Sequence, residues 1–297
     1  MSTGLTTAEA LSLDFWKASE PGLTIEGGAT APTGAFEDPK RLMAELRYEG
    51  YVNVPGVLAA DYVERLRLCV ERLNTRKIPL PFAFVYDQYW QAFQAVSSFI
   101  ELALGQNYKA MPDFWVWCVT PSETSTGWGP HRDKVIPTLD RDNSPHTLTV
   151  WLPFSESTPL NGCIYVLPAH LDDRFKKRSW DGETNTDVTV PQNIRALPAS
   201  AGSMLAWNQA ILHWGGRASR MAQAPRISVA FEFQRGDKNP FNTPLLDPKK
   251  LPPFHQRLGL IAKQVLQYAH MYPLSPEVQK LAETLRDRYT PGAALRF

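Results

Sequence analysis

The sequence lacks the features that would place it in a membrane, in the secretory pathway or on nucleic acid. No uninterrupted apolar stretch is long enough to span a bilayer, so we expect no transmembrane helix. The first residues, MSTGLTTAEALSLDF, have no basic segment followed by an apolar one, which argues against a secretory signal peptide. The formal net charge is +1 and the basic residues form no run, so neither nucleic acid nor an anionic membrane is an expected partner.

Cysteine is also scarce. The three cysteines, Cys69, Cys118 and Cys163, are widely spaced, odd in number and form no CxxC pair. This pattern predicts neither a zinc knuckle nor a disulfide framework. Free thiols in a reducing compartment are the simplest interpretation, and we expect a cytoplasmic protein.

The first part of the chain predicts an arm followed by helices. Residues 1–38 are rich in Gly, Thr, Ala and Pro and are expected to form a loosely ordered N-terminal arm. Residues 39–112 predict a mainly helical flank, which opens with a helix that starts at Pro39 and stops at Gly50. A short strand over YVNV follows, then an amphipathic helix over 59–74. We expect a second helix around YWQAFQAVSSFIELALG.

The pattern of apolar residues changes at residue 113. Between there and residue 235, short apolar runs alternate with turn signals: DFWVWCVT, HTLTVWLPF, GCIYVLPA, GSMLAWN and RISVAFEFQ. Repeated short strands of this kind predict an antiparallel sandwich or barrel. Residues 250–297 return to helix, with one over FHQRLGLIAKQVLQYAH and another that opens at Ser275-Pro276. We therefore predict one domain over 1–297, mainly β with flanking helices.

His131 and Asp133 are the first candidate metal ligands. In an extended segment, residues i and i+2 point to the same face, so the pair can present an imidazole and a carboxylate to one point, with Arg132 turned away. A second histidine from another strand would complete a facial triad, which suits Fe(II) and leaves positions open for a co-substrate and dioxygen.

Several histidines compete for the third position. His213 lies in WNQAILHWGG, His170 ends the strand-like segment VLPAH, and His146 starts another strand. We prefer His213 because Arg226 and Ser228 follow it. His170 remains the best competitor and is otherwise interpreted as structural.

Arg226 and Ser228 share one face of the strand RISVAFEF and can both point into the barrel. A buried arginine needs a carboxylate, because an unpaired buried charge is costly. A dicarboxylic co-substrate would supply one in the bidentate geometry of a guanidinium. An internal salt bridge to Asp or Glu is the alternative.

Together these segments resemble the phytanoyl-CoA dioxygenase family of Fe(II)/2-oxoglutarate-dependent oxygenases. The resemblance runs from about residue 40 to 235 and rests on GYVNVPGVL, on TVWLPFSESTPLNGCIYVLPAH and on the four site residues His131, Asp133, His213 and Arg226, the last in an Arg-x-Ser with Ser228. It implies a double-stranded β-helix (jelly-roll) core over 113–235. It also implies that 2-oxoglutarate chelates the iron and places its far carboxylate on Arg226.

The resemblance further implies that Trp151 and Thr149 lie near the co-substrate. The sequence departs from the family pattern at Trp128 and Cys163, where many relatives carry glutamine and threonine or serine. Because Asp133 keeps the carboxylate that related halogenases lack, the resemblance favours hydroxylation, desaturation or a related oxidation of a C–H bond over halogenation. Of these we expect hydroxylation, with O2 consumed and succinate and CO2 as co-products.

The substrate is less well defined by the sequence. The aromatic stretch FAFVYDQYWQAF, together with Trp115, Trp117 and Trp214, can line a pocket or simply fill the core. We expect a small apolar or amphipathic molecule, and a homodimer is compatible with the sequence. Two other functions remain open: a cupin-like dioxygenase or isomerase that does not use 2-oxoglutarate, and a catalytically inactive jelly-roll used for binding.

Overall fold

The computed structural model describes residues 4–28, 36–121, 128–134, 138–177, 190–272 and 274–290. Its strands form two antiparallel sheets. The larger has the order β1-β6-β3-β8-β2 and the smaller the order β5-β4-β7. The strands are β1 (Tyr51–Val54), β2 (Lys109–Val119), β3 (Thr147–Pro153), β4 (Ile164–Leu167), β5 (Arg195–Leu197), β6 (Met204–Asn208), β7 (Leu212–Gly215) and β8 (Arg226–Gln234).

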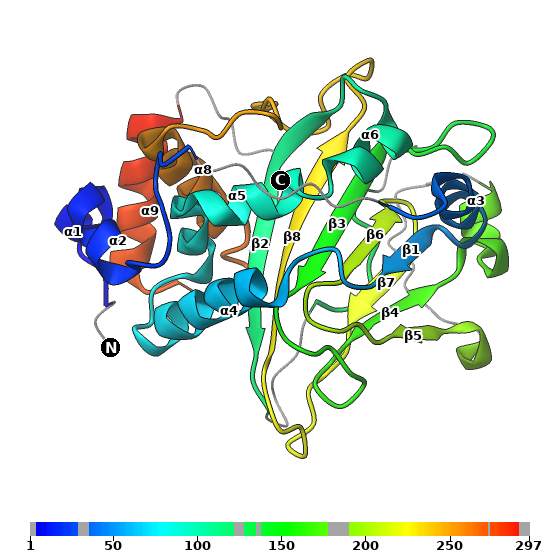
Figure 1. Cartoon of the computed structure of the whole chain (residues 1–297), viewed down its shortest axis with the longest axis horizontal. Helices are drawn as coiled ribbons and strands as arrows, with labels where there is room; N and C mark the ends of the chain where they lie inside the picture. Colours follow the sequence, from blue (N-terminus) through cyan, green and yellow to red (C-terminus); the bar gives the residue numbers. More distant parts are fainter. Residues whose placement is uncertain are drawn as a thin grey trace.

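Helices cover the outer face of the larger sheet. In Figure 1, α1, α2, α8 and α9 gather beside β2, whereas α3 lies beside β1 at the opposite edge. The α-helices are α1 (Thr7–Leu11), α2 (Leu13–Ser19), α3 (Pro39–Glu49), α4 (Ala60–Thr75), α5 (Asp87–Gln94), α6 (Ser97–Leu104), α7 (Asp173–Lys177), α8 (Phe254–Gln267) and α9 (Pro276–Tyr289). Short 3-10 turns cover η1 (Leu80–Val85), η2 (Ala169–Leu171) and η3 (Pro191–Asn193).

Apart from the edge strand β1, the strands of the larger sheet are largely buried on both faces, and their alternation separates two environments. On β3, Leu148, Val150 and Leu152 join the core beneath the helices. Trp151, from the opposite face, joins a second core between the two sheets. The same alternation on β8 sends Ile227, Val229, Phe231 and Phe233 to the helices. The intervening residues of β8 therefore face the interior of the barrel, and this alternation builds the site.

Most elements expected from the sequence are present. The helix from Pro39 ends at Gly50, which has φ +86° and so adopts the left-handed conformation that glycine tolerates. Ser275 caps α9 by accepting a hydrogen bond from the Val278 amide. Each of the five apolar runs contains a strand of the structure. The short strands β5 and β7 lie outside those runs and were not predicted.

Two expectations are wrong. The helix expected around 89–105 is divided into α5 and α6. The N-terminal arm is not loosely ordered over residues 4–28, because it folds into α1 and α2. Thr6 and Glu9 form a capping box at the start of α1, and the fully buried Trp16 stacks on Phe82 with ring centroids 5.6 Å apart. Packing of one large aromatic side chain thus outweighs the loop-like composition.

None of the helices in the described ranges is long and apolar enough to cross a membrane.

Candidate active site

Three side chains from two segments converge inside the barrel. His131 and His213 pair their backbones in an isolated antiparallel bridge, and Asp133 follows two residues after His131. The Asp133 Oδ1 atom lies 3.3 Å from His131 Nε2 and 3.5 Å from His213 Nε2. The three possible ligand atoms lie within 4.8 Å of one another, a separation that one metal ion can bridge.

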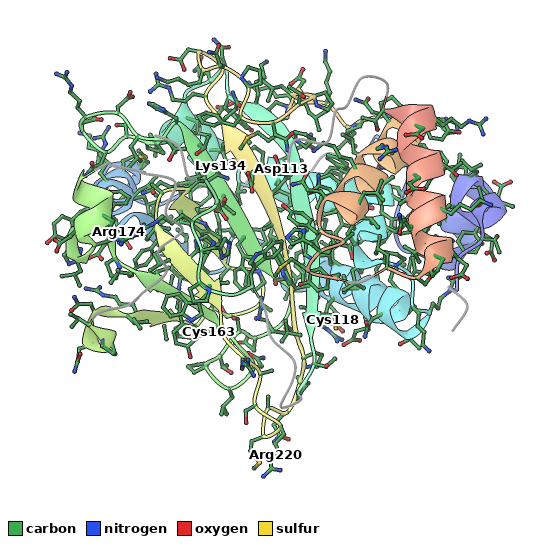
Figure 2. The ribbon with its side chains drawn as sticks, turned by 180° about the vertical axis from the view of Figure 1, so that it is seen from behind. Asp113, Cys118, Lys134, Cys163, Arg174 and Arg220 are labelled. Carbon is green, nitrogen blue, oxygen red and sulfur yellow. The ribbon has the colours of Figure 1, made fainter. Side chains whose placement is uncertain are left out.

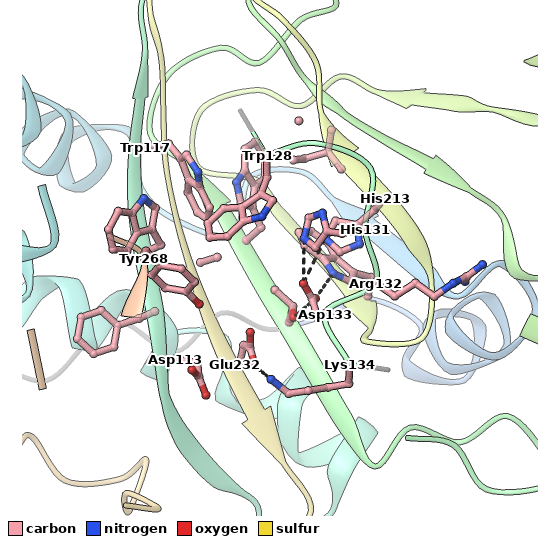
Figure 3. A pocket seen from close by; sticks show the side chains of 18 of the residues that line it. Asp113, Trp117, Trp128, His131, Arg132, Asp133, Lys134, His213, Glu232 and Tyr268 are labelled. Atoms are coloured by element: carbon pink, nitrogen blue, oxygen red, sulfur yellow. Dashed lines mark hydrogen bonds and ion pairs between the residues drawn. The ribbon is translucent and has the colours of Figure 1, made fainter. Parts of the chain in front are cut away.

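The backbone selects the nitrogen that each histidine presents. His131 Nδ1 lies 2.6 Å from the Gly129 carbonyl oxygen, and His213 Nδ1 lies 3.2 Å from the Ile211 carbonyl oxygen. A carbonyl can only accept, so Nδ1 carries the proton and Nε2 keeps its lone pair. Both Nε2 atoms face Asp133, as Figure 3 shows. This is the arrangement expected of metal-binding histidines.

The second carboxylate oxygen of Asp133 is held away from that point. Its Oδ2 atom accepts a hydrogen bond from Thr149 Oγ1 at 2.7 Å and another from Trp207 Nε1 at 2.9 Å. Gln209 Nε2 in turn donates to Thr149 Oγ1 at 3.0 Å, which directs the hydroxyl proton towards Asp133. Oδ1 is therefore the oxygen left for a metal. Sequence reasoning missed Trp207 and Gln209, whose role depends on strand register.

Two of the three groups carry the protonation states that a cation needs. Burial alone would raise the pKa of Asp133, but the two histidines and the Thr149 hydroxyl hold it well below its ordinary value. Burial lowers the pKa of His213 to about 4, despite the nearby Asp133. Burial also acts to lower the pKa of His131, but its hydrogen bond and charge interaction with Asp133 outweigh this effect and raise it. Asp133 is thus anionic and His213 neutral at physiological pH.

Arg226 forms the second part of the site. Its side chain is 1% exposed and donates one hydrogen bond, from Nη1 to Ser228 Oγ at 3.0 Å, while Nε has no partner. The guanidinium carbon lies 5.6 Å from the centre of the Trp151 ring. No carboxylate pairs with Arg226 among the described residues, and burial lowers its pKa to about 10. The internal salt bridge considered as an alternative is therefore not found there.

These groups line one cavity of about 240 Å³. Arg226, Trp151 and Thr149 contribute to its wall, together with the three convergent side chains. The remaining wall has an aromatic part, formed by Trp115, Trp117, Trp128 and Tyr268. It also has a polar end, which we define as Asp113, Lys134, Glu232 and Gln267. Figure 3 shows Asp113, Glu232 and Lys134 gathered beside Asp133, with the Tyr268 hydroxyl directed towards them.

The competing histidines serve other contacts. His170 stacks on Tyr48 with ring centroids 4.4 Å apart, and its Nδ1 lies 3.4 Å from Glu49 Oε2. His146 Nε2 lies 2.8 Å from Asp140 Oδ1. Arg132 turns away from the convergent point, as alternation predicts, and its Nη1 lies 2.8 Å from Asp172 Oδ2. Neither His170 nor His146 joins the metal-like cluster in the described part of the chain.

The polar end of the cavity was not anticipated from the sequence. Asp113 lies where the β2–β8 register shifts between Ala110 and Phe114, a bulge that local sequence does not reveal. Glu232 could have been found, because it continues the alternation of Arg226 and Ser228 along β8. Gln267 and Tyr268 come from the end of α8 and the residue after it, and only tertiary packing brings them here.

The comparison with protein families agrees with this geometry. Residues 82–222 match the family model described as phytanoyl-CoA dioxygenase (PhyH). The match contains His131, Asp133 and His213 and ends before Arg226.

Similar solved structures extend over most of the chain. The α-ketoglutarate-dependent epimerase SnoN from nogalamycin biosynthesis is 19% identical with a TM-score of 0.53, and the alignment covers 72% of this chain and 94% of SnoN. HygX from Streptomyces hygroscopicus, solved with nickel and 2-oxoglutarate, is 17% identical with a TM-score of 0.52 over 68% of this chain and 88% of HygX. The carbocyclase SnoK, also from nogalamycin biosynthesis, is 19% identical with a TM-score of 0.51 over 69% and 87%. These similarities establish the jelly-roll fold.

Proposed function

We propose that the chain is a member of the phytanoyl-CoA dioxygenase family of non-heme iron oxygenases that use 2-oxoglutarate and O2, and that it hydroxylates a C–H bond of a small apolar or amphipathic molecule. Bound Fe(II) and 2-oxoglutarate supply the oxidising power drawn from O2, with succinate and CO2 as co-products. In this proposal His131, Asp133 and His213 hold the iron. Arg226 and Ser228 hold the far carboxylate of 2-oxoglutarate.

One observation carries the proposal: a facial set of ligand atoms shares its cavity with a buried arginine that lacks a carboxylate. The ligand set alone would suit several metalloenzymes. Arg226 adds the specific requirement for an anion, because its guanidinium is withdrawn from water and its Nε has no partner. A dicarboxylate that reaches from the metal to Arg226 satisfies both ends of the cavity at once.

The chain's own residues prepare this site in three ways. Thr149 and Trp207 fix Asp133 so that one oxygen faces the metal. Trp151 covers the guanidinium of Arg226 and keeps water from it. The aromatic part of the wall supplies the apolar surface against which a substrate carbon can be held close to the metal.

The reaction outcome needs its own evidence, since the similar structures include an epimerase and a carbocyclase. We favour hydroxylation because Asp133 completes the ligand set and the open positions on the metal are reserved for co-substrate and O2. A hydroxylated product gains one oxygen atom, whereas epimerisation leaves the mass unchanged and ring closure by oxidation removes two hydrogens. Mass spectrometry of the product under ¹⁸O2 separates the three.

The first test is anaerobic titration of the protein with Fe(II) and then 2-oxoglutarate. We expect a weak charge-transfer band in the visible for the wild type and none for His213→Ala. On admission of O2, the wild type should convert 2-oxoglutarate to succinate. If iron binds but 2-oxoglutarate is never consumed, the co-substrate assignment fails and a cupin-like enzyme without 2-oxoglutarate becomes the better description. If the band persists in His213→Ala, the ligand assignment fails instead.

A further inference from the structure

The polar end of the cavity carries hydrogen-bonding and charged side chains that neither the metal nor the co-substrate requires. Figure 2 shows Asp113 and Lys134 towards one end of the strands, with Cys118 and Cys163 towards the other. Arg226 belongs to the second of these ends, because its neighbour Ile227 pairs with Cys118 in the β2–β8 ladder. The polar end is thus separated from the co-substrate arginine and is left for the substrate.

Glu232 lies next to the metal ligands. It is the cross-strand partner of Thr149, whose hydroxyl donates to Asp133. Partners across a strand pair have their Cβ atoms about 5 Å apart, so a group bound to Glu232 lies beside the reacting centre. Its Oε2 accepts from Lys134 Nζ at 2.8 Å, and in the described part of the chain Oε1 remains available to the cavity.

Asp113 is held rigidly at the same end. Asn242 Nδ2 donates to both of its oxygens, at 2.7 and 2.8 Å, and Gln267 Nε2 donates to Oδ1 at 2.9 Å. The ammonium of the buried Lys263 donates in turn to Asn242 Oδ1 and Gln267 Oε1. The bulge in β2 turns Asp113 towards the cavity, a common device beside active sites.

This end of the cavity holds charges of both signs. Glu232 pairs with the ammonium of Lys134, and the ammonium of Lys263 binds the amide oxygens of Asn242 and Gln267, the two residues that donate to Asp113. An added ammonium would meet Lys134, and an added carboxylate would meet Glu232 and Asp113. A hydroxyl group is repelled by neither kind of charge, because it can donate to a carboxylate and accept from an ammonium at the same time.

The aromatic part of the wall completes the pattern. Tyr268 meets Trp115 and Trp128 edge to face, with ring centroids 4.7 and 4.9 Å apart, and Trp117 meets Trp128 in the same way at 6.1 Å. The rings give the cavity an apolar side opposite its hydrogen-bonding end. Such a site suits a saturated ring that has C–H groups on its face and hydroxyls on its rim.

We propose that the substrate carries a neutral, hydroxylated ring, such as a sugar or cyclitol unit. Its hydroxyls bind Glu232 and Lys134, and its C–H face packs on Trp128 and Tyr268. This inference rests on the proposed function, since it assigns the substrate of the same site. Glu232 and Lys134 then decide which carbon of the ring is presented to the metal.

The test measures binding of three probes to the Fe(II)- and 2-oxoglutarate-loaded protein without O2, by calorimetry. The probes share a six-membered ring and differ in charge: cyclohexyl β-D-glucoside, cyclohexylammonium and cyclohexanecarboxylate. We expect the glucoside to bind best, since each charged ring is repelled by one member of the Glu232–Lys134 pair. Weaker binding of the glucoside than of either ion, or no binding of it at millimolar concentration, overturns the proposal.

Two variants make the test specific to the ion pair. Glu232→Gln removes the carboxylate, so glucoside affinity should fall about 10- to 100-fold while cyclohexanecarboxylate gains affinity from the freed Lys134. Lys134→Met should instead favour cyclohexylammonium. Glu64→Gln, in the exposed pair with Arg67 on α4, is the matched control and should change neither. A structural role would weaken all probes alike, and that result also overturns the proposal.

The proposed function is judged separately, by succinate formation in the wild type. A protein that forms succinate yet fails to bind the glucoside remains a 2-oxoglutarate oxygenase with a different substrate. A protein that forms no succinate fails the earlier test whatever the probes show.

Discussion

Arg226→Met should separate the co-substrate from the fold. The variant keeps the length of the side chain but removes the guanidinium that we assign to the far carboxylate of 2-oxoglutarate. Truncation of a buried, charge-assisted pair costs about 2–5 kcal/mol, or about 30- to 4,000-fold in affinity. Arg226 is 1% exposed, so little water screens the interaction, and we expect a loss of at least about 100-fold.

The stability of the ligand-free variant distinguishes a co-substrate role of Arg226 from a structural role more clearly. Because Arg226 has no carboxylate partner in the described residues, its removal leaves no buried anion behind. The free energy of unfolding of the ligand-free protein should therefore fall by less than about 1 kcal/mol, or rise. Arg257 is the matched contrast: it is fully buried and its Nη2 lies 2.6 Å from Asp87 Oδ1. Arg257→Met strands the buried Asp87 and should cost about 3–5 kcal/mol.

Thermal unfolding of the metal-loaded protein with and without 2-oxoglutarate measures both the stability of the protein and its gain from bound 2-oxoglutarate. Saturating ligand stabilises the wild type by about 2.7 kcal/mol at a hundredfold excess over Kd, and this gain should largely vanish in Arg226→Met. Arg226→Lys keeps the charge but not the bidentate fork and should fall between the two. The reasoning is refuted if Arg226→Met destabilises the ligand-free protein as much as Arg257→Met, or weakens iron binding as much as 2-oxoglutarate binding.

Three further predictions test the surroundings of the site. Trp207→Phe and Thr149→Val each remove one donor from Asp133 Oδ2 and should lower iron affinity about 10- to 100-fold in a chelator competition; unchanged affinity would show that neither donor positions the ligand. His170→Gln should leave iron affinity unchanged in the same assay, since His170 stacks on Tyr48. A large loss of iron affinity would indicate that His170 is a ligand after all. Trp16→Ala should lower the free energy of unfolding by about 3–5 kcal/mol in denaturant titrations, whereas a negligible effect would mean that the N-terminal helices contribute little to the fold.

Local alternation predicted the parts of the site that lie on one segment. His131 and Asp133 converge and Arg132 turns away because side chains in extended backbone point to alternate faces. Arg226 and Ser228 share a face for the same reason. The strands β2, β3 and β8 were predictable because their apolar residues fill two cores at once, which leaves long apolar runs in the sequence.

Contacts that depend on register could not be read in this way. Trp207 looks like an ordinary core aromatic until β6 is aligned with β3, which pairs it with Thr149 beside Asp133. The strand β7, which carries His213, has four residues and gives too short a pattern to detect. The bulge that turns Asp113 inward is likewise a property of two strands together. Each of these misses involves a partner chosen by tertiary structure.

The aromatic wall has a consequence for how the enzyme can be changed. Tyr268 and Gln267 come from the C-terminal end of α8 and the residue after it, far along the chain from the proposed iron ligands. Gln264 and Gln267 of this helix hold β2 at Phe114 and Asp113, whereas Tyr268 contacts the wall through its ring, so Tyr268 can be exchanged without removing a hydrogen bond to β2. Substrate preference is therefore partly separable from the proposed metal site, and a library confined to position 268 would sample new substrates while the hydrogen bonds from Gln264 and Gln267 to β2 are kept.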